Sequence, residues 1–193
     1  MVKLVAICGE ESRHPRLSPS HGFGLLIDGR LLFDACSRAA AEEFAKVLSP
    51  RPTLGIASME NPHHVEGFSA FGVPIIRWRR GELAIRLGGV EYRILGLGRE
   101  AVLLVKRTII SPCGMYTMPF GKLSSLGIKA DCFVGGLGGS TASPYAVAKI
   151  LGELRALGAR CIAPLHSAPG IIKEAEKKFN VYRLGAGSEF EIP

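Results

Sequence analysis

The sequence predicts a single-domain α/β protein in which two mixed β-sheets pack between helices. Both ends of the 193-residue chain alternate short apolar runs with helical patterns, whereas the middle contains closely spaced strand patterns. Two strand-and-helix ends around a strand-rich middle are typical of such a layered arrangement. The length suits one domain with a sizeable core. Because neither a repeat nor a linker divides the chain, we expect one domain over residues 1–193.

The first third of the chain predicts a strand, a hairpin, a helix and a buried strand. Residues Met1–Cys8 form an apolar run without the length or flanks of a signal peptide, so we interpret them as the first strand. Asp28-Gly29 lies between two apolar runs and is a strong signal for a two-residue hairpin turn. Ser37 is the expected N-cap of a helix with an apolar face, and the run Thr53–Ala57 predicts a buried strand.

The middle of the chain predicts an antiparallel meander, because glycines separate its strand patterns at short intervals. The final third alternates strands and helices, and Ser188–Ile192 can add a last strand. The strands expected in the middle are Val73–Arg77, Glu82–Leu87, Val90–Leu95 and Ala101–Val105, with an extension over Lys106–Ile110. The elements expected in the final third are strand Asp131–Val134, helix Pro144–Leu157, strand Cys161–Leu165, helix Gly170–Phe179 and strand Val181–Leu184.

Composition describes a soluble globular protein. Hydrophobic residues make up 47% of the chain and charged residues 21%. No apolar run reaches the roughly 20 residues of a membrane span, so we expect a cytoplasmic protein without membrane contact. The chain contains no glutamine and few asparagines, which is a trait of hyperthermophile proteins and indicates a thermophilic source.

The net charge of +7 suits an anionic partner, either a small molecule or a nucleic acid. The densest basic run is Arg77–Arg80, in which Trp78 could stack on a base. A strand end followed by a solvated turn at Gly81 explains the same residues more simply. Because the chain has no RNA-binding motif and no long basic helix, we do not expect a nucleic-acid partner.

The five cysteines are scattered and include no C-x-x-C pair, which argues against a disulfide framework or a zinc ribbon. Cys8, Cys132 and Cys161 lie in apolar runs and are expected to be small buried hydrophobic residues. Cys36 and Cys113 follow strand ends, and we expect them to pack rather than to supply a thiolate. In a hyperthermophile protein an intracellular disulfide would nevertheless be acceptable.

The loop Ser58–Phe68 follows the strand Thr53–Ala57 and holds two of the five histidines, His63 and His64. Open α/β sheets place ligand sites in loops beyond the carboxyl ends of their strands, and this loop is in such a place. On residue types alone, an exposed pair is the better interpretation, because adjacent side chains need not converge. His166, after the strand pattern that ends at Leu165, has an equally simple alternative as a strand-end histidine bonded to backbone groups.

Several segments match one known family in the same order along the chain. His21–Asp34 is similar to a strand, turn and strand that end in an aspartate. Ser58–Phe68 stands where the family has S-H-x-H-x-D-H-x-G-G. Gly135–Leu137 matches a G-G-F-H, Pro164–His166 a P-x-H, and Tyr182–Gly187 a closing strand. The chain resembles the metallo-β-lactamase fold, most closely the branch similar to archaeal dihydropterin (ribofuranosylaminobenzene phosphate) synthases. The resemblance implies a four-layer αββα sandwich with these loops at one edge.

The departures from the family motif concern the metal ligands. The first two histidines of the motif fall on Met59 and Asn61, and the histidine after the later glycine pair falls on Gly138. The resemblance therefore implies that one metal position is lost. It also implies that the second survives as a three-histidine site for one zinc or another divalent ion. The ligands of that degenerate site would be His63, His64 and His166.

The resemblance also implies roles for residues around the metal. Asp34 would orient a ligand imidazole, although it could equally cap the following helix. Glu60 or Glu66 could act as general base or oxygen ligand, with surface glutamates as the simpler alternative. A glycine-rich loop could cradle a phosphate with its NH groups, or could merely connect two elements. Its candidate ligand-binding residues are Gly135, Gly136, Gly138, Gly139 and Ser140.

Three functions remain open on the sequence. The first is a metal-dependent hydrolase with a one-metal site that acts on an anionic small molecule, for example a phosphorylated one. The second, ranked almost level, is a metal-free relative that binds an anionic ligand without chemistry. The third, well behind, is a nucleic-acid or protein-interaction module. Fold alone does not decide among them, and the sequence defines neither the substrate nor an oligomeric state.

Overall fold

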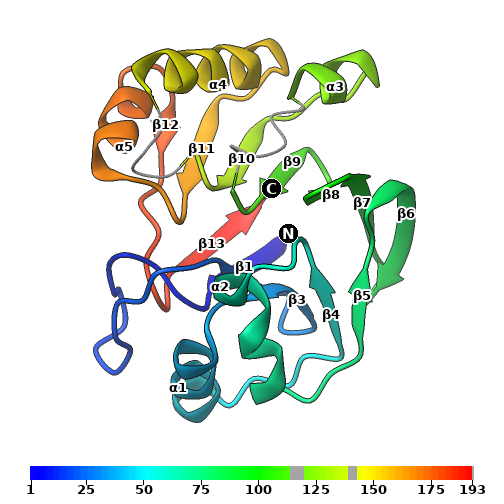
Figure 1. Cartoon of the computed structure of the whole chain (residues 1–193), viewed down its shortest axis with the longest axis vertical. Helices are drawn as coiled ribbons and strands as arrows, with labels where there is room; N and C mark the ends of the chain where they lie inside the picture. The colour runs from blue at the N-terminus through cyan, green and yellow to red at the C-terminus, as the bar shows by residue number, and fades with distance from the viewer. Residues whose placement is uncertain (114–119, 139–142, 193) are drawn as a thin grey trace.

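Two β-sheets stack face to face, and helices cover the outer face of each sheet (Figure 1). The computed structural model describes residues 1–113, 120–138 and 143–192. Helices α1 and η1 pack on the first sheet, and α3, α4 and α5 pack on the second. The expected four-layer αββα arrangement is confirmed. None of the helices in these ranges combines the length and the apolarity that a membrane crossing needs.

The element bounds follow the predicted order closely. The first sheet has the order β13 (Glu189–Ile192), β1 (Val2–Ala6), β2 (Gly24–Ile27), β3 (Leu31–Ala35), β4 (Leu54–Ala57), β5 (Ile75–Arg77). The second has the order β12 (Asn180–Val181), β11 (Cys161–Pro164), β10 (Cys132–Gly135), β9 (Thr108–Ser111), β8 (Ala101–Val105), β7 (Val90–Leu97), β6 (Arg80–Leu87). The helices are α1 (Arg38–Leu48), α2 (Pro62–Val65), the 3-10 helix η1 (Glu66–Ala70), α3 (Phe120–Ser125), α4 (Pro144–Ala156) and α5 (Pro169–Glu176).

Strand direction brings distant loops to the same edge. In the first sheet β1, β2 and β3 are antiparallel neighbours, whereas β3, β4 and β5 run parallel. The carboxyl ends of β1, β3 and β4 therefore lie at the same edge as the amino end of β2. In the second sheet β9, β10, β11 and β12 run parallel. All four begin at one edge of the sandwich and end at the other.

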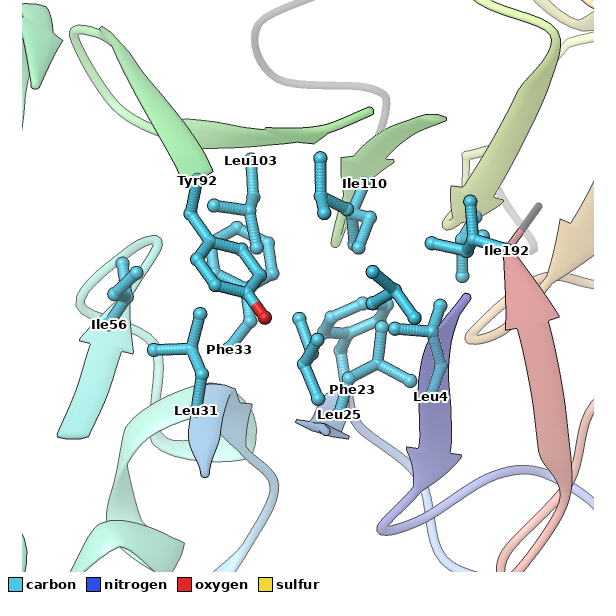
Figure 2. Close-up of a cluster of buried hydrophobic side chains, with 14 of the residues drawn as sticks. Leu4, Phe23, Leu25, Leu31, Phe33, Ile56, Tyr92, Leu103, Ile110 and Ile192 are labelled. Carbon is cyan, nitrogen blue, oxygen red and sulfur yellow. The ribbon is translucent and has the colours of Figure 1, made fainter. Parts of the chain in front are cut away.

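The main core fills the space between the two sheets (Figure 2). Phe23 and Phe33 from the first sheet meet edge to face, with ring centroids 6.3 Å apart. Tyr92 of β7 is buried against them, and its hydroxyl donates to Asp28 Oδ2 at 3.2 Å in the β2–β3 turn. Burial raises the pKa of Tyr92, so this hydroxyl keeps its proton and can donate the bond.

Local signals in the first third are confirmed with one adjustment. Ser37 caps α1, and its Oγ accepts a hydrogen bond from the backbone N of Ala40 at 3.5 Å. The hairpin at Asp28-Gly29 is present, but its loop has three residues because Ile27 pairs with Leu31. Asp28 adopts φ 49°, a left-handed conformation that aspartate tolerates better than most residues.

The expected extension of the meander over Lys106–Ile110 is confirmed as β9, which pairs antiparallel with β8 and begins at Thr108, because Lys106 adopts φ 52° in the turn between them. Two other strand expectations are wrong in extent. The run Val181–Leu184 stays in the sheet only to Val181, after which Leu184 packs into the core between the sheets. Gly81 does not separate two strands. It lies inside β6 opposite Gly96, where a side chain on Gly96 would meet the backbone of Arg80 at 2.3 Å.

The interpretation of the cysteines is wrong for two pairs. Cys132 and Cys161, 29 residues apart in the chain, are register partners on adjacent strands and form a disulfide. Cys8 and Cys36, 28 residues apart, form the other. Cys8 follows β1 and Cys36 follows β3, the two strands that flank β2. The bond passes beside Gly24, where a Cβ would lie 2.7 Å from Cys36 Sγ. Pairing depends on which strands adjoin, and spacing in the sequence does not reveal it.

Candidate functional site

Four histidines from three segments gather at one edge of the sandwich. His21 precedes β2, His63 and His64 lie on α2 after β4, and His166 follows β11. The ring centroids of His21 and His166 are 4.3 Å apart, and those of His64 and His166 are 5.7 Å apart. His63 lies on the outer side, 5.3 Å from His21. The structure thus brings the predicted ligands His64 and His166 together and adds His21.

The short helix α2 fixes the backbone position of His64. Pro62 occupies the first turn, where its missing N–H costs nothing. Asn61 caps the turn, and its side-chain oxygen accepts from the backbone N of His63 at 3.1 Å. Asn61, which stands where the resembled motif has a histidine, therefore has a structural role. His64 is only 1% exposed, whereas His63 points toward solvent.

Asp34 is the anchor of the buried side of this cluster. It adopts φ 53° at the end of β3 and is completely buried. Its carboxylate accepts from Ser58 N at 2.7 Å, from Ser58 Oγ at 2.6 Å and from His64 Nδ1 at 2.7 Å. Because Nδ1–H of His64 donates to Asp34, the lone pair of that imidazole is on Nε2. Asp34 does not cap the following helix, since Ser37 does so.

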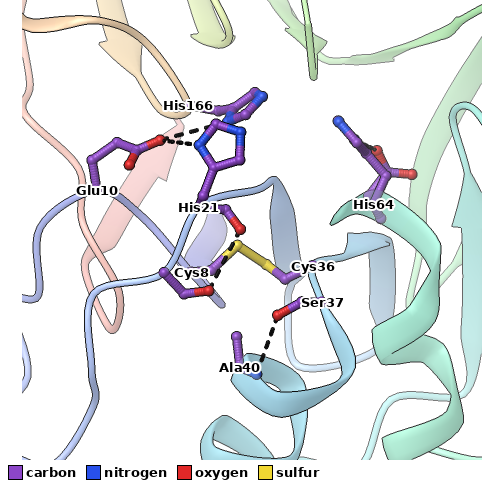
Figure 3. Close-up of a disulfide and its surroundings, with 10 residues drawn as sticks. Cys8, Glu10, His21, Cys36, Ser37, Ala40, His64 and His166 are labelled. Carbon is purple, nitrogen blue, oxygen red and sulfur yellow. Dashed lines mark hydrogen bonds and ion pairs between the residues drawn. A yellow bond between two sulfur atoms is a disulfide. The ribbon is translucent and has the colours of Figure 1, made fainter. Parts of the chain in front are cut away.

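A second carboxylate approaches the cluster from the opposite side (Figure 3). Glu10 Oε1 lies 2.8 Å from His21 Nδ1 and 3.7 Å from His166 Nδ1. The three residues Glu10, His21 and His166 offer ligand atoms that all lie within 4.8 Å of one another. His166 Nδ1 is buried and has no hydrogen-bond partner among the described residues. We call the edge that carries Glu10, His21, Asp34, His64 and His166 the site edge.

Burial keeps His166 neutral. Desolvation, together with charge repulsion from nearby His21, His64 and His63, lowers the pKa of its imidazole to about 4. A neutral imidazole retains a lone pair for a metal at physiological pH. His166 also adopts φ 61°, an uncommon conformation for a residue other than glycine.

The donor set fits a divalent metal of the zinc class. Two imidazoles and one carboxylate are ordinary zinc ligands, and His64 supplies a further imidazole next to His166. The buried and unpartnered Nδ1 of His166 is the feature that a metal would explain best. The donor atoms that already converge belong to Glu10, His21 and His166, which differs from the expected set His63, His64 and His166.

Glu10 and His21 were missed as candidate ligands on the sequence, although a signal for both exists. Glu10 follows the end of β1, and His21 precedes the start of β2, the antiparallel neighbour of β1. These positions share an edge with the loop after β4, so the strand-end argument used for His63 and His64 also applies to them.

The predicted catalytic glutamates lie away from the donor atoms. Glu60 forms ion pairs with Arg79 at 2.8 Å and with Arg77 at 3.3 Å. Glu66 is exposed on η1, and its backbone carbonyl accepts from Ser69 Oγ. Their catalytic role stays a prediction. Arg79 also donates to the carbonyl oxygens of Ala57 and Ser58, so part of the basic run supports the histidine loop.

The glycine-rich loop uses much of its backbone internally. Gly136 N donates to Ser111 O, and Gly138 N donates to the Cys113 carbonyl oxygen at 3.3 Å. Gly135 adopts φ 136°, and a Cβ there would collide with the Ser111 carbonyl oxygen at 1.9 Å. These glycines have a packing role at the end of β10. Gly139 and Ser140 lie outside the described residues, and phosphate binding by this loop stays a prediction.

A small pocket adjoins the histidines on the side of α5. It has a volume of about 90 Å³ and is lined by Glu10, His166 and Ser167 together with Lys173 and Arg183. Arg183 is paired with Glu176 at 2.6 Å, whereas Lys173 is exposed and forms no ion pair within the described ranges. The pocket therefore places the unpaired ammonium group of Lys173 beside the candidate ligands, within the described ranges.

Comparison with known proteins identifies the fold. No family model matches the sequence, and no curated protein matches it. Tm1679, described as a metal-dependent hydrolase of the β-lactamase superfamily, superposes with a TM-score of 0.74 at 16% identity, over 100% of this chain and 99% of that one.

Two other solved structures also superpose on nearly the whole chain. A diphosphatase of the PhnP family superposes with a TM-score of 0.66 at 10% identity, over 100% of this chain and 98% of its own. Zinc-bound PqqB from Methylobacterium extorquens gives 0.65 at 11% identity, over 98% of this chain and 100% of its own. At these identities the likeness shows the fold, which is the metallo-β-lactamase fold expected from the sequence.

Proposed function

We propose that this protein is a metal-dependent hydrolase that uses a single divalent ion at the site edge and acts on an anionic, phosphorylated small molecule. The observation that carries the proposal is the buried, unpartnered Nδ1 of His166 among the converging donors of Glu10 and His21. The metal-dependent hydrolases that share the fold support the reaction class.

The residues that would hold the ion are His166, His21 and Glu10, with His64 as the further imidazole. When bound, such an ion lowers the pKa of a water molecule and polarises the scissile phosphoryl bond. Asp34 fixes the tautomer and orientation of His64 through Nδ1, an arrangement common for metal-bound imidazoles. Met59 and Asn61 are poor ligands for a second ion, because a thioether is soft and an amide oxygen is weak.

Phosphate recognition would come from outside the donor set. Lys173 lines the same pocket as His166 and Glu10 and can bind a phosphate oxygen. The diphosphatase that shares the fold is a protein with such a substrate class. We also propose that the protein is most similar to dihydropterin synthase-like proteins. Zinc, rather than another divalent ion, is the metal we propose.

The test is hydrolysis of chromogenic phosphomonoesters and phosphodiesters by native protein supplied with zinc or manganese. His166→Asn should lower kcat/KM at least about 100-fold, because loss of supporting contacts alone typically costs 10–100-fold. His14→Asn, outside the cluster, is the matched control and should retain activity. Metal-dependent hydrolysis that survives in His166→Asn would contradict the proposal. Binding of phosphate without hydrolysis would favour a metal-free anion-binding relative.

A further inference from the structure

Positive charge is concentrated at the edge of the second sheet opposite the site edge. The parallel strands β9, β10, β11 and β12 begin there, and their first residues are level. Cys132 is the register partner of Thr108 and of Cys161, and Cys161 is the partner of Asn180. The segments that lead into these strands are separated by about 20 to 30 residues in the sequence, yet they form one row.

The segments leading into these strands carry lysine and arginine far more often than acids. Seven cationic side chains lie there, and all are exposed. Asp131 is paired with Arg107 at 2.9 Å, and Lys177 is paired with Glu174. The remaining five form no ion pair within the described parts of the chain. These five define the basic edge: Lys106, Lys129, Arg155, Arg160 and Lys178.

The basic edge is hollowed and rigid. Lys106 and Lys129 line a surface groove of about 740 Å³, and Arg155, Arg160 and Lys178 line a second one of about 390 Å³. Backbone bonds tie the row together, since Arg160 N donates to Asp131 O and Asn180 N donates to Arg160 O. The disulfide between Cys132 and Cys161 joins the two central strands at this end. The fixed backbone holds the cations at a constant spacing, which favours a repeating anion over a diffuse counterion cloud.

We propose that the basic edge binds the phosphate backbone of a nucleic-acid duplex, without reading its sequence. Four neighbouring strands about 4.8 Å apart give a row of about 14 Å. Such a row spans about four base-pair steps of a duplex at roughly 3.4 Å of axial rise per step. This surface is separate from Arg77–Arg80, where two arginines are paired with Glu60, and it revises the expectation that nucleic acid is not a partner.

Two observations favour a duplex over other polyanions. A single strand is usually held by exposed aromatic side chains, but Phe179, the one aromatic residue among the described residues that lines these grooves, is only 8% exposed. A lipid surface is usually held by inserted apolar side chains together with cations. Leu126 is the one large hydrophobic side chain exposed along the grooves in the described residues. Concave grooves lined by cations suit a rod of phosphates better than a flat bilayer.

The test is fluorescence anisotropy of labelled 20-base-pair DNA and RNA duplexes with the full-length protein at several salt concentrations. The edge variant is Lys129→Gln, Arg160→Gln, Lys178→Gln. The matched control, Arg16→Gln, Arg51→Gln, Arg80→Gln, removes the same number of exposed, unpaired cations elsewhere. Thermal unfolding confirms that both variants are folded.

The edge variant should bind at least about tenfold more weakly near 0.1 M salt, and its slope of log affinity against log salt should fall by about 3. The control should stay within about twofold of native. His166→Asn should leave duplex affinity unchanged, because the site edge is at the opposite end. Equal losses in both triple variants would overturn the proposal, as would a loss in His166→Asn. Binding to phosphatidylserine vesicles without duplex binding would replace it with a lipid surface.

Discussion

The two ends of the sandwich are both built from strand ends but differ in chemistry. At the site edge, Asp34 and His64 are buried, and burial shifts the pKa of His166 far from its usual value. At the basic edge, the ionisable groups are exposed and charged. A disulfide lies at each end, Cys8–Cys36 near the histidines and Cys132–Cys161 in the basic row. The comparison shows that burial shifts the pKa of a histidine at one end, whereas strand register alone gathers charge at the other.

The largest expected effects come from the two disulfides. Because they close loops of almost equal length, 28 and 29 residues, their chain-entropy contributions should be nearly equal. Each double alanine variant should lower the free energy of unfolding by about 3–4 kcal/mol in chemical denaturation. Only Cys8→Ala with Cys36→Ala should also weaken metal binding. If both double alanine variants weakened metal binding equally, the two ends of the sandwich would not be independent.

The pH dependence of stability should come from the site edge. In metal-free protein, His166 takes up a proton near pH 6.5 when unfolded but only near pH 4 when folded. The unfolded state then binds more protons between these values, so stability falls as the pH is lowered from 6.5 to 4, by on the order of 3 kcal/mol. Denaturation across this range should give a flatter profile for His166→Asn than for native protein or His14→Asn. Equal slopes of unfolding free energy against pH in all three proteins would contradict the lowered pKa of His166.

Substitution of one aspartate at each end compares the effects of a buried and an exposed carboxylate. Asp34→Asn replaces a buried carboxylate that accepts three hydrogen bonds, so it should cost about 2 kcal/mol of stability and weaken metal binding 10–100-fold. Asp131→Asn alters an exposed pair with Arg107 and should leave stability and metal binding close to native. Calorimetric metal titration of both variants measures the difference. Similar losses in the two would show that Asp34 does not position His64.

Local patterns in the sequence were enough for the element order and for the cap at Ser37. The resemblance to the metallo-β-lactamase fold predicted the four layers and the proximity of His64 to His166. Sequence could not reveal the disulfides or the basic edge, because both depend on register between strands that are distant in the chain. Cys132 meets Cys161, and Arg107 lies level with Arg160, only once β9, β10 and β11 align. Glu10 was overlooked because it follows a strand whose end carried no recognised motif.

The preference for His21 over His63 as a ligand can be tested by binding affinity. His21 belongs to the converging donor set and lies 4.3 Å from His166 between ring centroids, whereas His63 is outside that donor set. His21→Asn should weaken zinc binding about tenfold or more, and His63→Asn should change it less than about threefold. The opposite ranking would restore the ligand set expected from the family motif.

The most direct test of the account is the metal content of protein purified without chelator and then supplied with zinc. Native protein should hold about one equivalent, measured by mass spectrometry of the metal, because Met59, Asn61 and Gly138 stand where the resembled motif has the histidines of the other metal position. His166→Asn should hold almost none, and His14→Asn should match the native protein. No bound zinc in the native protein, or a full equivalent retained in His166→Asn, would contradict a metal centre at the site edge.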